Sequence, residues 1–236
     1  MTASLPVASF IGAIEFIFSE QSSNVTGGEK VGGFEQAVEL TLKQLEVTVL
    51  ALALALIIAL PLGLYLGHKG KGEFLIVGLA NGGRAIPELA VIALVAALIG
   101  VGLVTVTPAL AILGIPPILT NAYVGVRQVD RASVDAARGM GMSEMEIAHK
   151  VELPLAIPTV MGGVRGATIA IVATATIAPL AGVVTLGDYI INASIYGDDG
   201  RLAGAILVAL LALVLEGSLA LLQRRLTSDG LKVKTA

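Results

Sequence analysis

The residues best able to do chemistry lie in one polar segment, residues 130–154, between long apolar runs. Acidic and basic side chains alternate there with alanine, glycine and methionine. Charged groups at this density must stay in water, so the segment is expected at one face of a membrane. The pattern is typical of a docking surface for another protein. We therefore expect binding chemistry, through charge pairs and close contact, and no catalysis.

The first half of the polar segment predicts a short helix. Asp130 can N-cap a helix that begins at Arg131, because its carboxylate can accept from a free backbone N–H. Gly139 is a plausible glycine cap at its end, and Gly141 adds a second flexible point. These features indicate a glycine elbow after the helix.

The second half predicts another short helix. Ser143 with Glu146 three residues later forms a capping-box pattern, in which each residue satisfies a backbone N–H of the other. Proline disfavours a helical conformation in the residue before it, so the helix is expected to end at Leu153–Pro154. The polar segment is thus predicted to be two capped helices around an elbow.

Methionines around the elbow suit a binding surface that changes shape, because their side chains are flexible. Met140 and Met142 are expected to face a partner, and Met145 either a partner or the membrane helices. Ala136 and Ala137 are small and allow a partner to approach closely.

The composition is that of an integral membrane protein. Of 236 residues, 56% are hydrophobic and only 14% are charged, and the mean hydropathy is +0.89. With no cysteine and only two distant histidines, His68 and His149, the sequence predicts no disulfide, metal site or cofactor. His149 is expected to be solvated or to face the partner.

Apolar runs near the length needed to cross a bilayer predict an all-α protein with five transmembrane helices. Pro61 is expected to kink the first helix, and Pro116–Pro117 to break the third. An interfacial helix is expected before the first span, followed by a polar loop at residues 19–33, and residues 181–200 are expected to be turn-rich. The five predicted spans are 34–66, 74–100, 108–127, 157–180 and 202–222.

Basic residues are distributed asymmetrically between the predicted loops. By the positive-inside rule, the loop at 68–73, the polar segment and the C-terminus are cytoplasmic and the N-terminus is outside. The cytoplasmic side would hold Lys69, Lys71, Arg127, Arg131, Arg138, Lys150, Arg224, Arg225, Lys232 and Lys234, and the other side chiefly Lys30 and Arg201.

A polar interruption at residues 81–88 divides the second predicted span. A charge pair in a membrane is costly unless it faces protein or a water-filled cavity, so the interruption suggests a bend near a translocation path. The alternative is that Arg84 reaches the membrane interface. The path candidates are Asn81, Arg84, Pro87, Glu88 and Tyr123.

The fourth and fifth predicted spans carry isolated polar and small residues. Arg165 is expected to reach the interface or to pair with an acid of the polar segment, and Glu216 to reach the interface. A stripe of small residues allows close helix packing or lines a narrow path between two subunits. Its members are Gly162, Gly166, Ala170, Thr174 and Ala178. The few aromatic residues form no cluster along the sequence.

The polar segment resembles the "EAA" loop of permeases of ATP-driven (ABC) importers. Asp135–Ala136–Ala137, Gly141 and the run Val151-x-Leu153-Pro154 have the spacing of that loop. Asp135 stands where the family has Glu, and Val151 where it has Ile. Wider stretches, such as GGRAIPELAVIAL and VELPLAIPTVMGGVRGAT, resemble the osmoprotectant branch, which imports glycine betaine, carnitine or choline.

The resemblance implies a type I importer permease in the inner membrane of a prokaryote. The polar segment would be the coupling loop that contacts a cytoplasmic ATPase dimer; an extracytoplasmic binding protein would deliver substrate, and a second permease, more plausibly different than identical, would complete the pore. The sequence has no phosphate-binding G-x-x-x-x-G-K-[ST] motif, so ATP hydrolysis would come from the partner. The implied contact residues are Asp135, Ala136, Ala137, Gly139, Gly141, Met142, Glu146, Val151, Leu153 and Pro154.

Three parts of the chain are expected: an N-terminal helix and external loop (1–33), a permease domain (34–222) and a cytoplasmic tail (223–236). Two other functions stay open. A methionine-type amino-acid permease would share the loop and topology. A secondary transporter would need ion-binding carboxylates within its spans, and these are scarce here.

Overall fold

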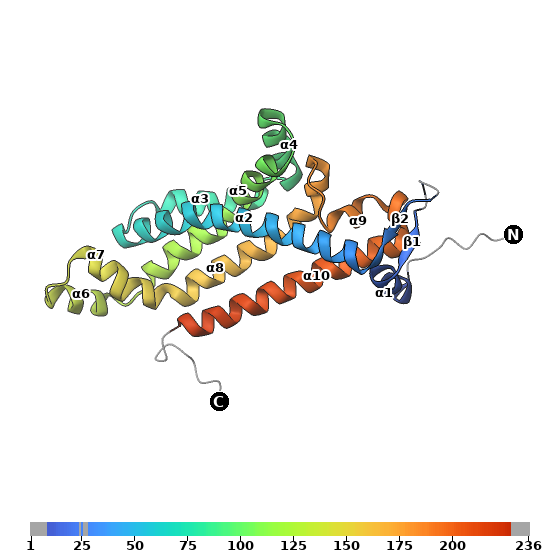
Figure 1. Ribbon diagram of the computed structural model, residues 1–236. Coiled ribbons are helices and arrows are strands. Elements are labelled where there is room, and N and C mark those ends of the chain that lie inside the picture. The colour runs from blue at the N-terminus through green and yellow to red at the C-terminus, as the bar shows by residue number, and fades with distance from the viewer. Residues whose placement is uncertain (1–8, 24, 26–27, 228–236) are drawn as a thin grey trace. The chain divides into compact units, whose positions relative to one another are not determined.

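The computed structural model describes residues 9–23, 25 and 28–227, without the side chains of Asn81 and Arg84. Helices dominate these residues, as the composition predicts (Figure 1). The α-helices are α1 Phe10–Phe18, α2 Gly33–Lys69, α3 Glu73–Ala85, α4 Glu88–Ile99, α5 Leu103–Arg127, α6 Arg131–Gly139, α7 Glu144–Ile147, α8 Leu153–Thr174, α9 Gly187–Ile191 and α10 Ala193–Leu226. A π-helix, η1, spans Ala148–Glu152 and a 3₁₀-helix, η2, spans Ala175–Ala181.

The chain forms two compact units, and each long helix contributes to both. The first unit comprises Met1–Leu50, Leu89–Leu110 and Val172–Leu213. The second comprises Ala51–Glu88, Ala111–Ile171 and Val214–Ala236.

Four stretches among the described residues are long and apolar enough to cross a membrane: Gly33–Lys69, Leu103–Arg127, Glu144–Ala181 and Ala193–Leu226. The predicted span 74–100 is instead divided into α3 and α4, with Ile86 and Pro87 between them. The expected interruption is therefore present, but the count of five transmembrane helices is not confirmed. Proline at 87 cannot continue the hydrogen-bond ladder of α3, which explains the break.

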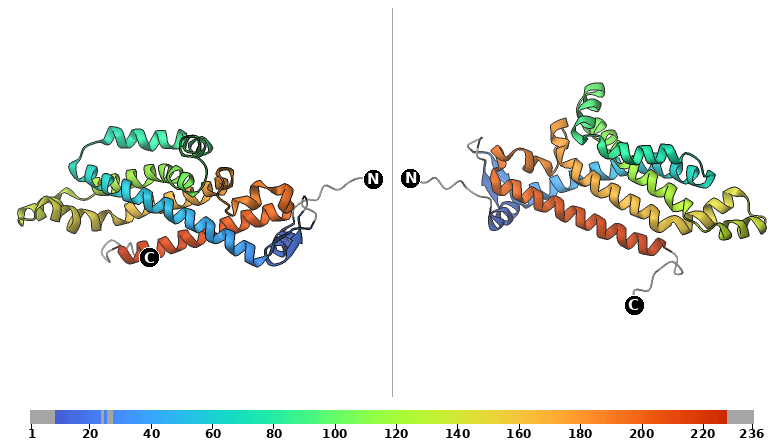
Figure 2. Two further views of the ribbon diagram at one scale, coloured as in Figure 1. Left: turned by 45° about the horizontal axis from the view of Figure 1, so that its top comes forward. Right: turned by 180° about the vertical axis from the view of Figure 1, so that it is seen from behind.

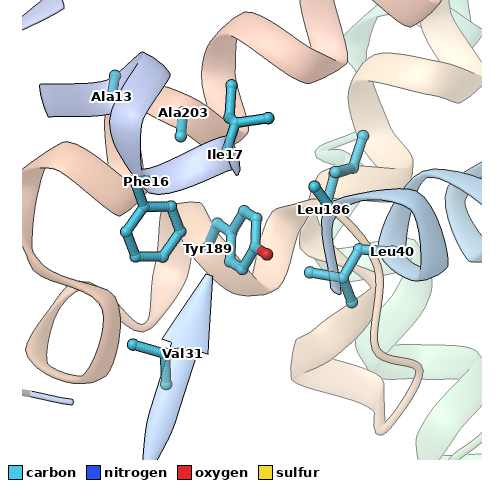
Figure 3. Close-up of a cluster of buried hydrophobic side chains, with 9 residues drawn as sticks. Ala13, Phe16, Ile17, Val31, Leu40, Leu186, Tyr189 and Ala203 are labelled. Carbon is cyan, nitrogen blue, oxygen red and sulfur yellow. The ribbon is translucent and has the colours of Figure 1, made fainter. Parts of the chain in front are cut away.

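The core of the first unit joins α1, the residues around β2 and the start of α10 (Figure 3). Tyr189 lies between Phe16 and Leu186, and its ring meets the ring of Phe16 edge-on at 5.2 Å. Its hydroxyl group donates to Oε1 of Gln36 at 3.1 Å. Tyr196 completes an aromatic cluster that residue spacing does not reveal. Phe16 and Tyr189 are fully buried, so the cluster is packed core and leaves no open cage for a cation.

A short β-hairpin lies where the sequence predicts only a loop. Strand β1, Glu20–Ser22, pairs antiparallel with β2, Lys30–Gly32, beside the first turns of α10 (Figure 2). Each strand has three residues, too few for an alternating pattern to be recognised. An ion pair of 3.1 Å between Lys30 Nζ and Glu20 Oε2 lies across the hairpin.

The second unit is held together by close packing of α2 on α5. A Cβ atom on Gly63 would lie 2.7 Å from the carbonyl oxygen of Leu119, and one on Gly67 would lie 3.0 Å from that of Tyr123. The absence of side chains at Gly63 and Gly67 thus lets the two backbones approach. Tyr123 is buried in this core.

Prolines within the long helices do not end them, contrary to the prediction for α5. That helix continues through Pro116–Pro117, and α2 continues through Pro61. A proline in a membrane helix is tolerated where neighbouring groups satisfy or shield the freed carbonyls. The side-chain amide of Asn121 donates to the carbonyl oxygen of Pro117 at 2.8 Å, one turn earlier in the same helix.

The later helices differ from prediction at their ends. The predicted span 157–180 becomes α8 followed by η2, and the buried Gln44 donates to the Val172 carbonyl at 2.8 Å shortly before this change. The stretch 181–200 contains α9 and the first turns of α10, which bend at Gly197 with a positive φ of 71°. Asp188 is half-buried and accepts hydrogen bonds from Asn192 and Tyr196, each at 2.6 Å.

Candidate functional site

The polar segment, residues 130–154, folds as two short helices, α6 and α7, joined by a glycine turn (Figure 1). The Asp130 carboxylate accepts from the backbone N–H of Ala132 at 3.2 Å and caps α6, as predicted. Ser143 and Glu146 form the predicted capping box, with both reciprocal bonds present. Local capping chemistry therefore determines where both helices begin.

The turn between the helices depends on Gly141 rather than on Gly139. Gly141 has a φ of +85°, a left-handed conformation that side chains disfavour. Gly139 is the last residue of α6, and a Cβ built on it meets nothing within 4 Å. No contact within the described chain requires glycine at position 139, which fits a surface that a partner approaches closely.

Ion pairs join the two helices. Arg138 Nε lies 3.0 Å from Oε1 of Glu144, and Arg138 Nη1 lies 3.2 Å from Oδ1 of Asp135. The hydrogen bond to Glu144 raises the pKa of Arg138 above its usual value. In another ion pair, Lys150 Nζ lies 2.8 Å from Oε1 of Glu146, which is one helical turn earlier in the chain. These pairs are exposed and weak individually, and only the pair of Arg138 with Glu144 connects α6 to α7.

One face of this pair of helices is open and adaptable. Met140 and Met145 are 77% and 68% exposed, whereas Met142 is half-buried. Ala136 is exposed, but Ala137 is buried and supports α6 from within. The exposed methionines and small residues give the surface expected of a docking site.

The segment does not end at Pro154 as predicted. The helix runs on from α7 through η1 into α8, and Val151, Leu153 and Pro154 lie half-buried within it. Proline lacks the N–H that would bond to the carbonyl of Lys150, and its ring crowds that carbonyl. The π-helix widens the turn just before it, so that Leu153 N–H bonds to the Ala148 carbonyl instead.

A nearly buried histidine, His68, contacts the polar segment, and no spacing in the sequence predicts this contact. Nδ1 of His68, in the last turn of α2, lies 2.7 Å from Oε2 of Glu152, 84 residues later. Both side chains are nearly buried, at 11% and 9% exposure. His149, by contrast, is exposed and lies with Nδ1 at 2.9 Å from the Met145 carbonyl oxygen.

A cavity of about 420 Å³ lies in the second unit, and one predicted path residue, Glu88, lines it. Glu88 lines it together with Thr120, Asn121 and small residues of α3 and α8. The hydroxyl oxygen of Thr120 is buried without a hydrogen-bond partner among the described residues. Spacing in the sequence did not indicate Thr120 or Asn121, because the cavity forms where Pro116 and Gly83 face each other.

Two other path candidates, Pro87 and Tyr123, do not line this cavity. Pro87 is exposed between α3 and α4, and Tyr123 is 5% exposed in the core, away from the residues that line the cavity. The side chains of Asn81 and Arg84 lie outside the described part of the chain.

Arg165 pairs with Glu216 within the apolar helices, not with an acid of the polar segment. Arg165 Nε donates to Oε1 of Glu216 at 2.9 Å, its Nη2 contacts the same carboxylate, and its Nη1 donates to Gln223 Oε1 at 2.8 Å. Gln223 Nε2 also donates to the carbonyl oxygen of Pro158 at 3.3 Å. Two predicted interfacial side chains thus form one polar contact between α8 and α10.

Comparison with known proteins identifies a family. Residues 59–228 match the binding-protein-dependent transport system inner membrane component. Similar proteins include the choline transport system permease protein OpuBB of Bacillus subtilis, 37% identical over 81% of this chain and 89% of that protein. The carnitine transport permease protein OpuCB of Listeria monocytogenes is 35% identical over 81% and 88%, respectively.

Solved structures show the same fold. A chain of the inward-facing MetNI methionine ABC transporter aligns with a TM-score of 0.71, covering 83% of this chain and 98% of that one. At 21% identity this likeness concerns the fold alone. The family match and the sequence relatives, by contrast, assign the chain to a protein family. The chain therefore belongs to the family of binding-protein-dependent transport system inner membrane components, as a permease similar to those of osmoprotectant importers.

Proposed function

We propose that the chain is the membrane-spanning permease subunit of an ATP-driven importer of compatible solutes such as glycine betaine, choline or carnitine. One observation carries the proposal: the polar segment is an exposed pair of capped, ion-paired helices in a chain that resembles choline and carnitine permeases. The subunit itself hydrolyses no ATP. Its part is to convert the motion of a separate ATPase into alternating access.

The coupling contact is proposed to use the exposed face of the polar segment. The surface around Gly139, Met140 and Gly141 is proposed to fit into a cleft of the ATPase dimer. Glu146 and Asp135 stabilise the helices of the segment through their ion pairs. Val151, Leu153 and Pro154 join this surface to α8. A rigid connection of this kind is what transmission of motion requires.

A second permease is proposed to cover the small-residue face of α8. Built Cβ atoms on Gly162 and Gly166 meet nothing within 4 Å, so neither glycine is explained by packing among the described residues. Small residues at a membrane helix interface allow close approach of another helix. We favour a different permease chain over a second copy, and a binding protein on the outer side as the source of substrate.

The topology is proposed to have the N-terminus outside and the C-terminus in the cytoplasm, with α3 and α4 together providing a fifth crossing. Residues 34–222 would then form the permease domain, between an external part (1–33) and a cytoplasmic tail (223–236). The basic residues near the α2–α3 connection and the polar segment support this orientation.

The translocation path is proposed to pass the cavity lined by Glu88 and Asn121. The break between α3 and α4 and the small residues Gly166 and Ala170 leave room there for a solute. Substrate selection rests mainly with the binding protein, because the aromatic cluster of Phe16 and Tyr189 is closed.

Reconstitution tests this function. The permease, its neighbouring ATPase and permease gene products and the binding protein are placed in liposomes. Glycine betaine or choline with the binding protein is expected to raise ATP hydrolysis about fivefold or more. Stimulation by methionine instead would favour an amino-acid permease. That alternative is supported only by the likeness in fold to a methionine transporter. Uptake driven by an ion gradient without ATP would show a secondary transporter.

A further inference from the structure

The contact between His68 and Glu152 joins α2 to η1. Glu152 is 7% exposed, and a carboxylate so deeply buried requires a partner. His68 supplies it at 2.7 Å from the far end of a long membrane helix. The polar segment and α2 are therefore joined by a specific polar bond.

Further charged groups extend this bond into the docking surface. Nε2 of His68 lies 3.3 Å from Oε2 of Glu144, so the ring faces two carboxylates. The ring donates to both only when both of its nitrogens carry protons. Glu144 also holds Arg138, which places α6 in the same network. Lys69 lies close by, on the wall of the adjoining cavity.

This cavity lies between side chains of α2 and side chains of the polar segment. It measures about 460 Å³ and separates apolar side chains of α2, such as Leu64 and Tyr65, from Met145 and Ala148. His68, Glu144 and Glu152 all line this cavity, so the polar contacts of His68 link its two sides. Behind His68, α2 is packed tightly on α5, because Gly67 approaches the backbone of Tyr123.

The π-helix places Glu152 at this position. An extra residue in the turn before Pro154 changes the direction of the side chains that precede it. Glu152 is the last residue of η1, and it is the buried member of the segment that meets His68. The π-helix η1 therefore ends at the residue that forms the long-range hydrogen bond with His68.

We propose that the His68–Glu152 hydrogen bond carries movement of the polar segment to α2 and, through Gly67, to α5. His68 is then a positioning residue for coupling: it acts through Glu152 and touches neither substrate nor ATP. This inference rests on the proposed function, since it assumes that an ATPase moves the polar segment.

The test compares uptake with ATP hydrolysis in the reconstituted full complex, using glycine betaine and choline as solutes. His68→Ala and Glu152→Ala are each expected to lower uptake per ATP hydrolysed about tenfold, while hydrolysis changes less than about twofold. The double variant should lose no more than the worse single variant, because the two residues act as one unit. Lys71→Ala, an exposed change two residues beyond α2, is the matched control and should behave as wild type.

A second pair of variants separates coupling from folding. His68→Gln with Glu152→Gln keeps a hydrogen bond without charge, and should retain at least about half of the uptake per ATP. The proposal is overturned if assembled His68→Ala complexes couple as well as wild type, if the single losses multiply, or if the Gln pair loses coupling tenfold. A wild-type complex in which the ATPase never binds the permease contradicts the proposed function itself, a result distinct from these three.

Discussion

Replacing Gly141 with glutamate is expected to lower ATP-dependent uptake at least about 100-fold while the chain still inserts into the membrane. Two effects combine. A side chain at φ +85° costs about 1–2 kcal/mol in the turn. A new carboxylate would also enter the surface that the ATPase must cover, where an unpaired charge weakens binding far more. Uptake into proteoliposomes and co-purification of the ATPase measure the loss.

Two control variants separate the turn from the surface. Gly141→Asn tolerates the left-handed conformation and should retain much of the activity. Gly139→Glu lies in open space at the end of a helix and leaves the fold intact, yet it should still block ATPase binding. If Gly139→Glu bound the ATPase normally, the exposed face of α6 would not be the docking surface.

Replacing Glu216 with leucine is expected to destabilise the permease by about 3 kcal/mol, the cost of an unpaired arginine in the middle of a membrane helix. Arg165 would lose the partner that holds its Nε and Nη2 atoms, and Gln223 alone cannot neutralise it. For a chain of this size the loss corresponds to a fall in melting temperature of about 6–12 °C. Thermal stability of a fluorescently tagged permease in detergent measures it.

The double variant Arg165→Leu/Glu216→Leu is the matched control. It removes both charges and places two apolar side chains in an apolar environment, so its stability should lie within about 1 kcal/mol of wild type. A double variant as unstable as Glu216→Leu would show that the pair contributes through packing or function rather than through charge neutralisation.

Sequence patterns predicted features that depend on neighbouring residues. Asp130, Ser143 and Glu146 cap their helices as expected, because capping requires only residues within one turn. Apolar runs located the long helices, since length and hydropathy are properties of a single segment. The break near Pro87 followed from proline's missing N–H.

Features that depend on distant contacts could not be predicted in this way. Pro116–Pro117 and Pro154 stay within helices, and a π-turn accommodates Pro154. The partner of Arg165 lies 51 residues away, and that of His68 lies 84 residues away. No local spacing identifies either pair. The buried cluster around Phe16 likewise joins residues from both ends of the chain.

The position of the polar segment and the caps of its helices could be predicted from the sequence. The hydrogen bond that joins the segment to α2 could not. Charge, glycine and methionine content predicted a docking surface around Gly141, and Met140 and Gly139 are exposed there. The link from Glu152 to α2, which connects this surface to the membrane helices, emerged only from the fold.

Site-specific cross-linking tests the docking surface most directly, because the chain contains no cysteine and accepts a single reporter. A benzophenone attached to Met140→Cys, whose native side chain is 77% exposed, is expected to cross-link the ATPase subunit in the assembled transporter. The same reporter on Lys30→Cys, exposed on the hairpin and proposed to lie outside, should not. A transporter that hydrolyses ATP and imports solute, yet shows no cross-link from position 140 to the ATPase, would contradict the assignment of residues 130–154 as the coupling surface.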